Sequence, residues 1–163
     1  MAVIHMRIDN RLIHGQVTAS WVSHIGADHI IVTNDKVSKD PIQKQLLPQA
    51  ARGVKTSVLS VDDTVDYVKS EEAQKEKIMI VAKFPSDALE LVEKGVEPEE
   101  INVGNQAPLP NKKCFPVTNQ IMVAEGQADI YRKIADKGYN LTVKLMPSDS
   151  PGDFIKKLDS KGL

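Results

Sequence analysis

Short apolar segments alternate with amphipathic segments along the whole chain. Runs rich in Val, Ile and other apolar residues predict strands at 3–9, 29–33, 55–60, 77–82, 101–103, 115–117 and 141–145. Apolar positions spaced three or four residues apart predict helices at 15–25, 41–51, 61–73, 86–94, 126–137 and 151–158. The run Ile78-Met79-Ile80-Val81 is apolar without alternation, which is typical of a strand covered on both faces.

The ends of several predicted helices carry signals of their own. Asp40 followed by Pro41 is typical of an N-cap and a first helical residue. Ser86 is expected to open the next helix, since serine favours helix starts. Gly95 and Gly138 follow helical patterns and are expected to adopt left-handed C-terminal caps.

Strand–helix alternation predicts an α/β fold, here an open, twisted, mostly parallel sheet of about seven strands with helices on both faces. We expect residues 1–163 to form a single domain. The segment 105–114 is the least regular, and we expect a functional loop or a connection to an edge strand. Ligands of such sheets gather at the carboxyl ends of strands, which nominates the loops 10–14, 34–36, 83–87 and 104–107.

Composition excludes several classes of protein. The 163 residues carry a formal net charge of −1, so no basic field points to nucleic acid. The single cysteine excludes an internal disulfide and a cysteine-rich metal site, and favours a reducing cytosol. Apolar runs reach only about five residues, where a membrane span needs about 20, and residues 1–5 do not resemble a signal peptide. Any role at a membrane is therefore expected to come through a partner.

The most informative site candidate is His14, which directly follows the first strand and its turn. Gly15 lets a ligand approach the backbone, and the first N–H groups of the following helix, from Gly15 to Val17, have no partners within the helix. Together with the helix dipole they predict an anion site, to which Arg11 adds donors suited to phosphate oxygens. Asp9 is expected to orient either Arg11 or the imidazole of His14.

Plainer interpretations of the same residues stay open. His14 could be a surface or capping histidine, Arg11 a solvated arginine, and Asp9 an ordinary turn residue. The other three histidines and Trp21 are predicted to be structural, and no histidine pair has the spacing of a metal site. The chain lacks a Walker-type loop, a dinucleotide-binding glycine motif and a Gly-x-Ser-x-Gly elbow, so we expect neither cofactor nor metal.

The segment from Arg7 to Val17, RIDNRLIHGQV, resembles the active-site signature of a known family. The family is the IIB component of the mannose/fructose/sorbose type in the bacterial sugar phosphotransferase system. The resemblance runs along the whole chain, through the strand that leads to Asn34-Asp35, through Gly95-Val96 and through 101–105. The family often has Gly-Met where this chain has Asn105-Gln106, and an acidic residue where it has Asn10. With Lys83 and Asn105, the chain is similar to the N-acetylgalactosamine/galactosamine branch.

This resemblance implies a phosphocarrier with His14 as the phosphohistidine intermediate. It would accept a phosphoryl group from a phosphorylated IIA protein and pass it to a sugar during uptake through the membrane components IIC and IID. The chain has no room for an additional IIA domain, so IIA is expected to be a separate protein. The protein is then expected in the cytoplasm, at the inner face of the membrane through its partners. Four loop residues are possible members of the site rim: Asn34, Asp35, Lys83 and Asn105.

Two other classes of function fit the same residues. A binding or regulatory module would hold a phosphorylated metabolite on His14 and Arg11 without forming a covalent bond. A phosphohydrolase would use His14 as a transient nucleophile, but no second histidine lies on a nominated loop. Covalent labelling favours the carrier, and turnover of a phosphate ester favours the hydrolase.

Overall fold

A computed structural model describes residues 2–163. Regular structure in the first half of the chain runs β1(Val3–Asp9), α1(Gly15–Ile25), β2(His29–Thr33), α2(Asp35–Ser38), α3(Pro41–Ala50), β3(Lys55–Leu59), α4(Val61–Val68), the short 3₁₀ helix η1(Ala73–Lys75) and β4(Ile78–Ala82). The second half runs α5(Pro85–Glu93), β5(Ile101–Asn105), β6(Cys114–Pro116), β7(Met122–Ala124), α6(Gln127–Asp136), β8(Leu141–Val143), β9(Gly152–Asp153) and α7(Phe154–Ser160).

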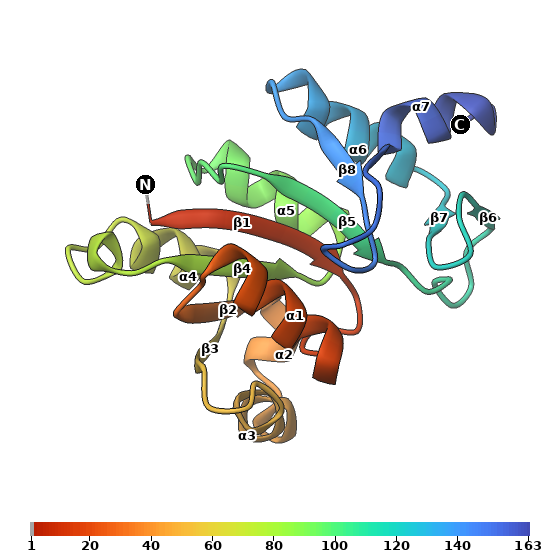
Figure 1. Ribbon diagram of the computed structural model, residues 1–163. Helices are drawn as coiled ribbons and strands as arrows, with labels where there is room; N and C mark the ends of the chain where they lie inside the picture. The colour runs from red at the N-terminus through yellow and green to blue at the C-terminus, as the bar shows by residue number, and fades with distance from the viewer. Residues whose placement is uncertain (1) are drawn as a thin grey trace.

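The central sheet has seven strands in the order β3-β2-β4-β1-β5-β8-β9 (Figure 1). All neighbours pair in parallel except β9, which pairs antiparallel with β8. The α/β fold with a mostly parallel sheet is thus confirmed. The seventh strand is β9, however, and not the predicted 115–117 segment. That segment, observed as β6, forms a separate antiparallel ribbon with β7, beyond the loop 106–113.

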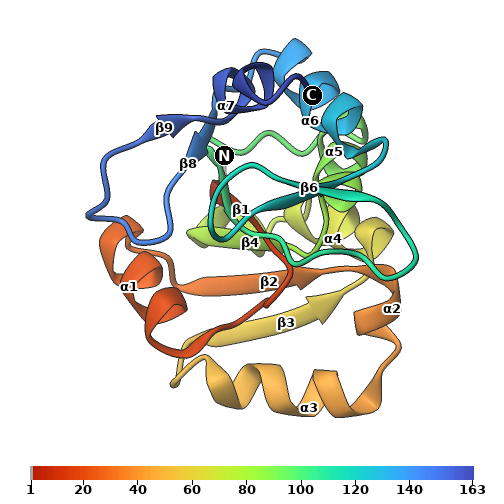
Figure 2. The ribbon, with the colours of Figure 1, turned by 90° about the vertical axis from the view of Figure 1, so that its right-hand side faces the viewer.

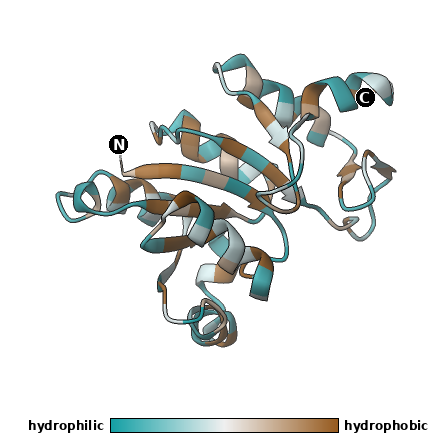
Figure 3. Ribbon diagram, in the orientation of Figure 1, coloured by the Kyte–Doolittle hydropathy of each residue, from teal (hydrophilic) through white to brown (hydrophobic). Residues whose placement is uncertain are grey.

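Helices cover both faces of the sheet, as predicted. On one face, α1, α2 and α3 pack over β2, β3 and β4 through a core that includes Trp21, Val37 and Leu47. On the other face, α4, α5, α6 and α7 pack over the strands through a core that includes Leu91 and Tyr131. Figure 3 shows the hydrophobic residues concentrated on the central strands.

Several helix boundaries follow the predicted signals, and others do not. Asp40 caps α3 by accepting from the N–H groups of its first turn, and Gly95 and Gly138 have left-handed φ values of 96° and 100°. Ser86 does not open α5: the helix begins at Pro85, and the carboxylate of Asp87 accepts from the N–H of Phe84, the N-cap. The predicted 61–73 helix is broken into α4 and η1, and the four-residue α2 was not anticipated.

The order of the strands places the loop after β1 at a switch point. From β1 the chain crosses β4 to reach β2, whereas from β4 it crosses β1 to reach β5. The carboxyl ends of β1, β4 and β5 therefore lie side by side where the two directions diverge. Figure 2 views the molecule from this side. None of the helices between residues 2 and 163 has both the length and the apolar character needed to span a bilayer.

Candidate functional site at the carboxyl end of β1

The loop between β1 and α1 is anchored by two buried apolar side chains. Leu12 and Ile13 enter the core beneath α1, and the N–H of Leu12 donates to the carbonyl of Asp9 at 3.1 Å. Leu12 has a φ of 64° and Gly15 one of 46°, so the chain twice takes the left-handed conformation in this short turn. Glycine adopts such a φ without steric cost, which accounts for Gly15. The turn leaves the intervening His14 exposed.

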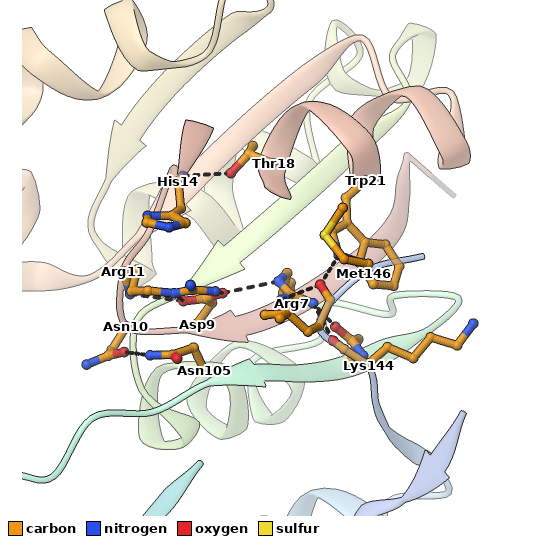
Figure 4. Close-up of polar contacts among 12 residues, drawn as sticks. Arg7, Asp9, Asn10, Arg11, His14, Thr18, Trp21, Asn105, Lys144 and Met146 are labelled. Atoms are coloured by element: carbon orange, nitrogen blue, oxygen red, sulfur yellow. Dashed lines mark hydrogen bonds and ion pairs between the residues drawn. The ribbon is translucent and has the colours of Figure 1, made fainter. Parts of the chain in front are cut away.

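His14 forms the N-cap of α1 through its backbone. Its N–H donates to Oγ1 of Thr18 at 2.8 Å, which fixes the backbone orientation from which the imidazole projects. Among residues 2–163, no hydrogen-bond or ion-pair partner of the imidazole is found. Figure 4 shows the ring beside the Arg11–Asp9 pair. The ring nitrogens are therefore open to a group from another molecule.

The N-terminus of α1 offers fewer free donors than expected from the sequence. The N–H groups of Val17 and Thr18 both donate to the carbonyl of His14, at 3.1 and 3.5 Å. The N–H groups of Gly15 and Gln16 have no acceptor within the described part of the chain. No acidic residue occupies the first turn of α1, so its positive end is not neutralised locally. Two backbone N–H groups, those of Gly15 and Gln16, thus remain available to an anion beside His14. The N–H group of Val17 is already hydrogen-bonded to the carbonyl of His14.

Asp9 holds Arg11 in place and does not contact the imidazole of His14. Its Oδ1 accepts from the backbone N–H of Arg11 at 3.0 Å and from Nε at 3.2 Å, and its Oδ2 accepts from Nη2 at 3.0 Å. The Asp9 side chain is 2% exposed and that of Arg11 is 26% exposed. Of the two roles that the sequence left open for Asp9, the structure therefore shows the orientation of Arg11, whose guanidinium keeps an edge toward solvent.

The four predicted rim residues are not equivalent. Asn105 is brought to the loop, because its amide donates to Oδ1 of Asn10 at 2.9 Å and its carbonyl accepts from the Asn10 N–H at 3.0 Å. Lys83 follows β4, next to β1, and its ammonium lies 5.3 Å from the ring centroid of Phe84. Asp35 begins α2 after β2, one strand further away, and its Oδ1 accepts from the N–H of Val61.

Asn34 is buried and serves the fold. Its Oδ1 accepts from the N–H of Val37 as the N-cap of α2, and its amide donates to Oδ2 of Asp87 at 3.0 Å. Burial raises the pKa of Asp87, while the hydrogen bond from Asn34 and that from the Phe84 N–H oppose the shift. With both ends of its amide engaged, Asn34 is a poor candidate for contact with a ligand.

Two residues near the site carry roles that sequence reasoning did not assign. Thr18 orients the His14 backbone, and a hydroxyl four residues after His14 was the signal that could have found it. Arg7 pairs with Asp9 at 3.3 Å and is almost fully buried. An arginine in the middle of the predicted 3–9 strand was the signal in that case.

The other histidines lie away from the loop. His5 stacks on Trp21 with a centroid distance of 4.9 Å, and His24 meets the same indole edge-on at 6.3 Å. His29 lies between Glu76, 2.7 Å from its Nδ1, and Ser57, 2.9 Å from its Nε2. Within residues 2–163, no group of three or more His, Cys, Asp or Glu side chains is arranged to hold a metal ion.

Comparisons with known proteins agree on one family. The family model described as "PTS system sorbose subfamily IIB component" matches residues 3–163. The N-acetylgalactosamine-specific phosphotransferase enzyme IIB component 2 of Escherichia coli K12 is 33% identical over 157 residues, which are 96% of this chain and 98% of that protein. The mannose-specific EIIAB component of the same strain is 34% identical over 157 residues, 94% of this chain and 48% of that longer protein.

A solved structure supports the same assignment. The crystal structure of the IIBSor domain of the sorbose permease from Klebsiella pneumoniae superposes with a TM-score of 0.91 at 32% identity. The superposition covers 98% of both chains. The three relatives carry the names of three different sugars at nearly equal identity.

Proposed function

Because this chain belongs to the sorbose-subfamily IIB components of the sugar phosphotransferase system, we propose that it carries a phosphoryl group on His14 between a phosphorylated IIA protein and a sugar. Members of this family are phosphotransferases of sugar uptake. The observation that carries the finer proposal is the exposed, unpartnered imidazole of His14 beside Arg11 and two free N–H groups. Such a set of donors suits the three equatorial oxygens of a phosphoryl group.

The proposed reaction has two balanced steps. In the first, an imidazole nitrogen of His14 attacks the phosphorus of the donor phosphohistidine, forming one N–P bond as the donor N–P bond breaks. The electron pair of the broken bond returns to the donor imidazole. In the second, a sugar hydroxyl oxygen attacks the same phosphorus, the bond to His14 breaks, and the hydroxyl proton passes to solvent. Neither step needs a redox partner or a nucleotide.

The site residues either stabilise charge on the phosphoryl group or fix the geometry of the groups that do so. Arg11 and the N–H groups of Gly15 and Gln16 stabilise the negative charge of the phosphoryl oxygens. Asp9 fixes the guanidinium of Arg11, and Thr18 fixes the backbone of His14. Because transfer passes through a loose transition state, alignment and charge supply most of the catalysis.

The proposed partners follow from the same family role. His14 must reach a IIA donor and then the membrane components IIC and IID with their sugar, so an exposed imidazole is required. Lys83, Asp35 and Asn105, on neighbouring loops, are proposed to contact these partners. The protein would then work in the cytoplasm, at the inner face of the membrane. We propose no sugar, because the relatives are named for different ones.

The experiment that tests this proposal measures covalent phosphate. Incubation with phosphoenolpyruvate and the upstream phosphocarriers should give an acid-labile phosphate at one per chain in the wild type and none in His14→Ala. His24→Ala is the matched control, because His24 lies exposed on the same helix and should label as the wild type does. Labelling of His14→Ala at the wild-type level would exclude His14 as the carrier.

Arg11→Ala tests the stabilising role of Arg11. Removal of one charged donor from a phosphoryl site is expected to slow transfer by about 10²-fold. The melting temperature should change little, because the Arg11 guanidinium is partly exposed and, within residues 2–163, hydrogen-bonds to Asp9 alone. Rapid-quench labelling provides the rate, and an unchanged rate would remove Arg11 from the mechanism.

The two alternative classes give different results in the same assay. A non-covalent binding module would show no label but would bind a sugar phosphate tightly by calorimetry. A phosphohydrolase would release inorganic phosphate from a phosphate ester in the absence of sugar acceptor and membrane components.

A further inference from the structure

Arg7 is a buried cation one layer behind the proposed phosphoryl site. Its Nη1 donates to Oδ1 of Asn102 and, at 2.9 Å, to the carbonyl of Lys144, and its Nη2 donates to the carbonyl of Leu145 at 3.1 Å. Its Cζ lies 5.1 Å from the ring centroid of Trp21. The side chain is 3% exposed. Arg7 therefore cannot contact a phosphoryl group on His14, and its charge must act through its neighbours.

The neighbour that links Arg7 to the site is Asp9. One carboxylate serves two arginines, because Oδ2 of Asp9 accepts from Nε of Arg7 at 3.3 Å and from Nη2 of Arg11 at 3.0 Å (Figure 4). If Asp9 faced Arg11 alone, the pair would be neutral and would attract an anion weakly. With Arg7 included, the three side chains carry a net charge of +1. Burial lowers the pKa of Arg7 to about 10, so the guanidinium remains protonated at neutral pH.

We propose that Arg7 is a positioning residue that balances the charge of Asp9 and so leaves the charge of Arg11 available to a dianionic phosphoryl group. The hydrogen bonds from Arg11 to Asp9 then fix the Arg11 guanidinium without cancelling the positive charge of Arg11. The inference rests on the proposed function for its biological meaning. The affinity of the protein for an anion is nevertheless measurable without any phosphoryl transfer.

The first test removes the buried charge. In Arg7→Met, the affinity for inorganic phosphate, followed by NMR shifts of the Arg11 Nε–H and of the Gly15 and Gln16 amides, should fall roughly ten-fold. Arg7→Lys keeps a cation beside Asp9 but not all the hydrogen bonds of the guanidinium, so its phosphate affinity should lie between those of Arg7→Met and the wild type. Wild-type phosphate affinity in folded Arg7→Met would overturn the proposal.

A second substitution separates charge balance from structural support. In the double variant Arg7→Met with Asp9→Asn, the cluster again carries +1, and the Asn oxygen still accepts from the Arg11 N–H groups. We expect phosphate affinity to recover at least three-fold relative to Arg7→Met. A merely structural role predicts that the double variant binds phosphate no better than the single one, and that result would overturn the proposal.

Asn102→Asp keeps the test valid if Arg7→Met does not fold. This nearly isosteric change sets a second carboxylate against Nη1 of Arg7, so that the cluster including Asn102 becomes neutral while Arg7 remains. Phosphate affinity should again fall roughly ten-fold. Thr142→Val is the matched control, because Thr142 contacts Asn102 but adds no charge, and should bind phosphate like the wild type. Unchanged affinity in Asn102→Asp, at a pH where the new carboxyl group is ionised, would contradict charge balance.

The outcomes distinguish failure of the inference from failure of the proposed function. If His14 accepts the covalent label but these variants bind phosphate equally well, the carrier stands and the role of Arg7 is wrong. If phosphate affinity follows the charge of the cluster but His14 is never labelled, Arg7 acts as proposed in an anion site of another function.

Discussion

Gly104, on β5, lies directly against the guanidinium of Arg7. A Cβ atom at this position would stand 2.3 Å from Cζ of Arg7, well inside van der Waals contact. The guanidinium cannot easily retreat, because its hydrogen bonds to Asn102, Lys144 and Leu145 hold it in place. The absence of a side chain at residue 104 is therefore a condition for burying an arginine within this sheet.

We predict that Gly104→Ala lowers the free energy of unfolding by about 1–3 kcal/mol, because overpacking displaces the buried Arg7 guanidinium. Urea denaturation measures the change, and phosphate affinity should fall with it, since the same guanidinium supports Arg11. The control is Gly152→Ala, where the nearest atom to the new Cβ is Cε of Lys157 at 2.8 Å. That end of a flexible side chain can move aside, so Gly152→Ala should cost less than Gly104→Ala. Equal costs would refute the proposed clash.

At the scale of elements, the amino ends of β2 and β3 are tied to the helical connections by one acidic side chain. The carboxylate of Glu76, after η1, contacts His29 of β2 at 2.7 Å, Lys55 of β3 at 2.5 Å and the hydroxyl of Tyr67 of α4 at 2.9 Å. Burial alone would raise the pKa of Glu76, but hydrogen bonds from these three groups lower it from 4.5 to about 2. The cluster lies at the amino ends of the strands, whereas His14 lies at their carboxyl ends.

This cluster predicts an acid-dependent stability. A pKa that is lower in the folded state stabilises the fold at pH values above about 4.5, and the contribution is lost as the pH falls toward 2. Glu76→Gln should therefore be about 1–3 kcal/mol less stable than the wild type at pH 7, and the gap should narrow between pH 5 and pH 2.5. Urea denaturation across this range measures the gap.

Glu72→Gln is the matched control for this titration. Glu72 contacts the same Lys55 at 3.2 Å, but its side chain is 68% exposed. A solvated ion pair contributes little, so this variant should stay within about 1 kcal/mol of the wild type at every pH. A gap between Glu76→Gln and the wild type that is constant with pH would show that Glu76 acts by packing alone.

At the scale of the whole molecule, two apolar cores share one sheet. Trp21 belongs to the core beneath α1, α2 and α3, whereas Leu91 belongs to the core on the opposite face. The central strands β2 and β4 contribute side chains to both cores, so neither core can lose its order without disturbing the other. We therefore propose that residues 1–163 fold as a single cooperative domain.

Leu91→Ala tests this cooperativity. The side chain of Leu91 is fully buried, and its truncation should cost about 2–5 kcal/mol. The fluorescence of Trp21, on the other face, should shift to the same lower urea midpoint as the far-UV circular dichroism. Leu46→Ala, at a position that is 54% exposed on α3, should shift neither by more than about 0.5 kcal/mol. An unmoved Trp21 transition in Leu91→Ala would show two independent units.

Local patterns in the sequence determined much of this molecule. The bounds of β1, β2 and α1 were predicted to the residue, because apolar periodicity and turn residues act over a few neighbours. The same holds for the α3 cap at Asp40 and for the placing of His14 after the first strand. Short elements such as α2 and β7 were not predicted from the sequence, since three or four residues carry too little periodicity to be recognised.

How distant segments meet follows from the packing of the folded chain and not from local patterns. The Arg7 guanidinium donates to the carbonyls of Lys144 and Leu145, which lie 137 and 138 residues further along the chain. The buried Asn34 donates to Asp87, 53 residues away. An alternating pattern indicates which face of a strand is apolar, but not which strand becomes its neighbour. Strand order, the separate β6–β7 ribbon and the charge balance around Asp9 depend on those neighbours. The position of His14 after the first strand therefore follows from local sequence patterns, whereas the packing of remote segments places the charged side chains around that loop.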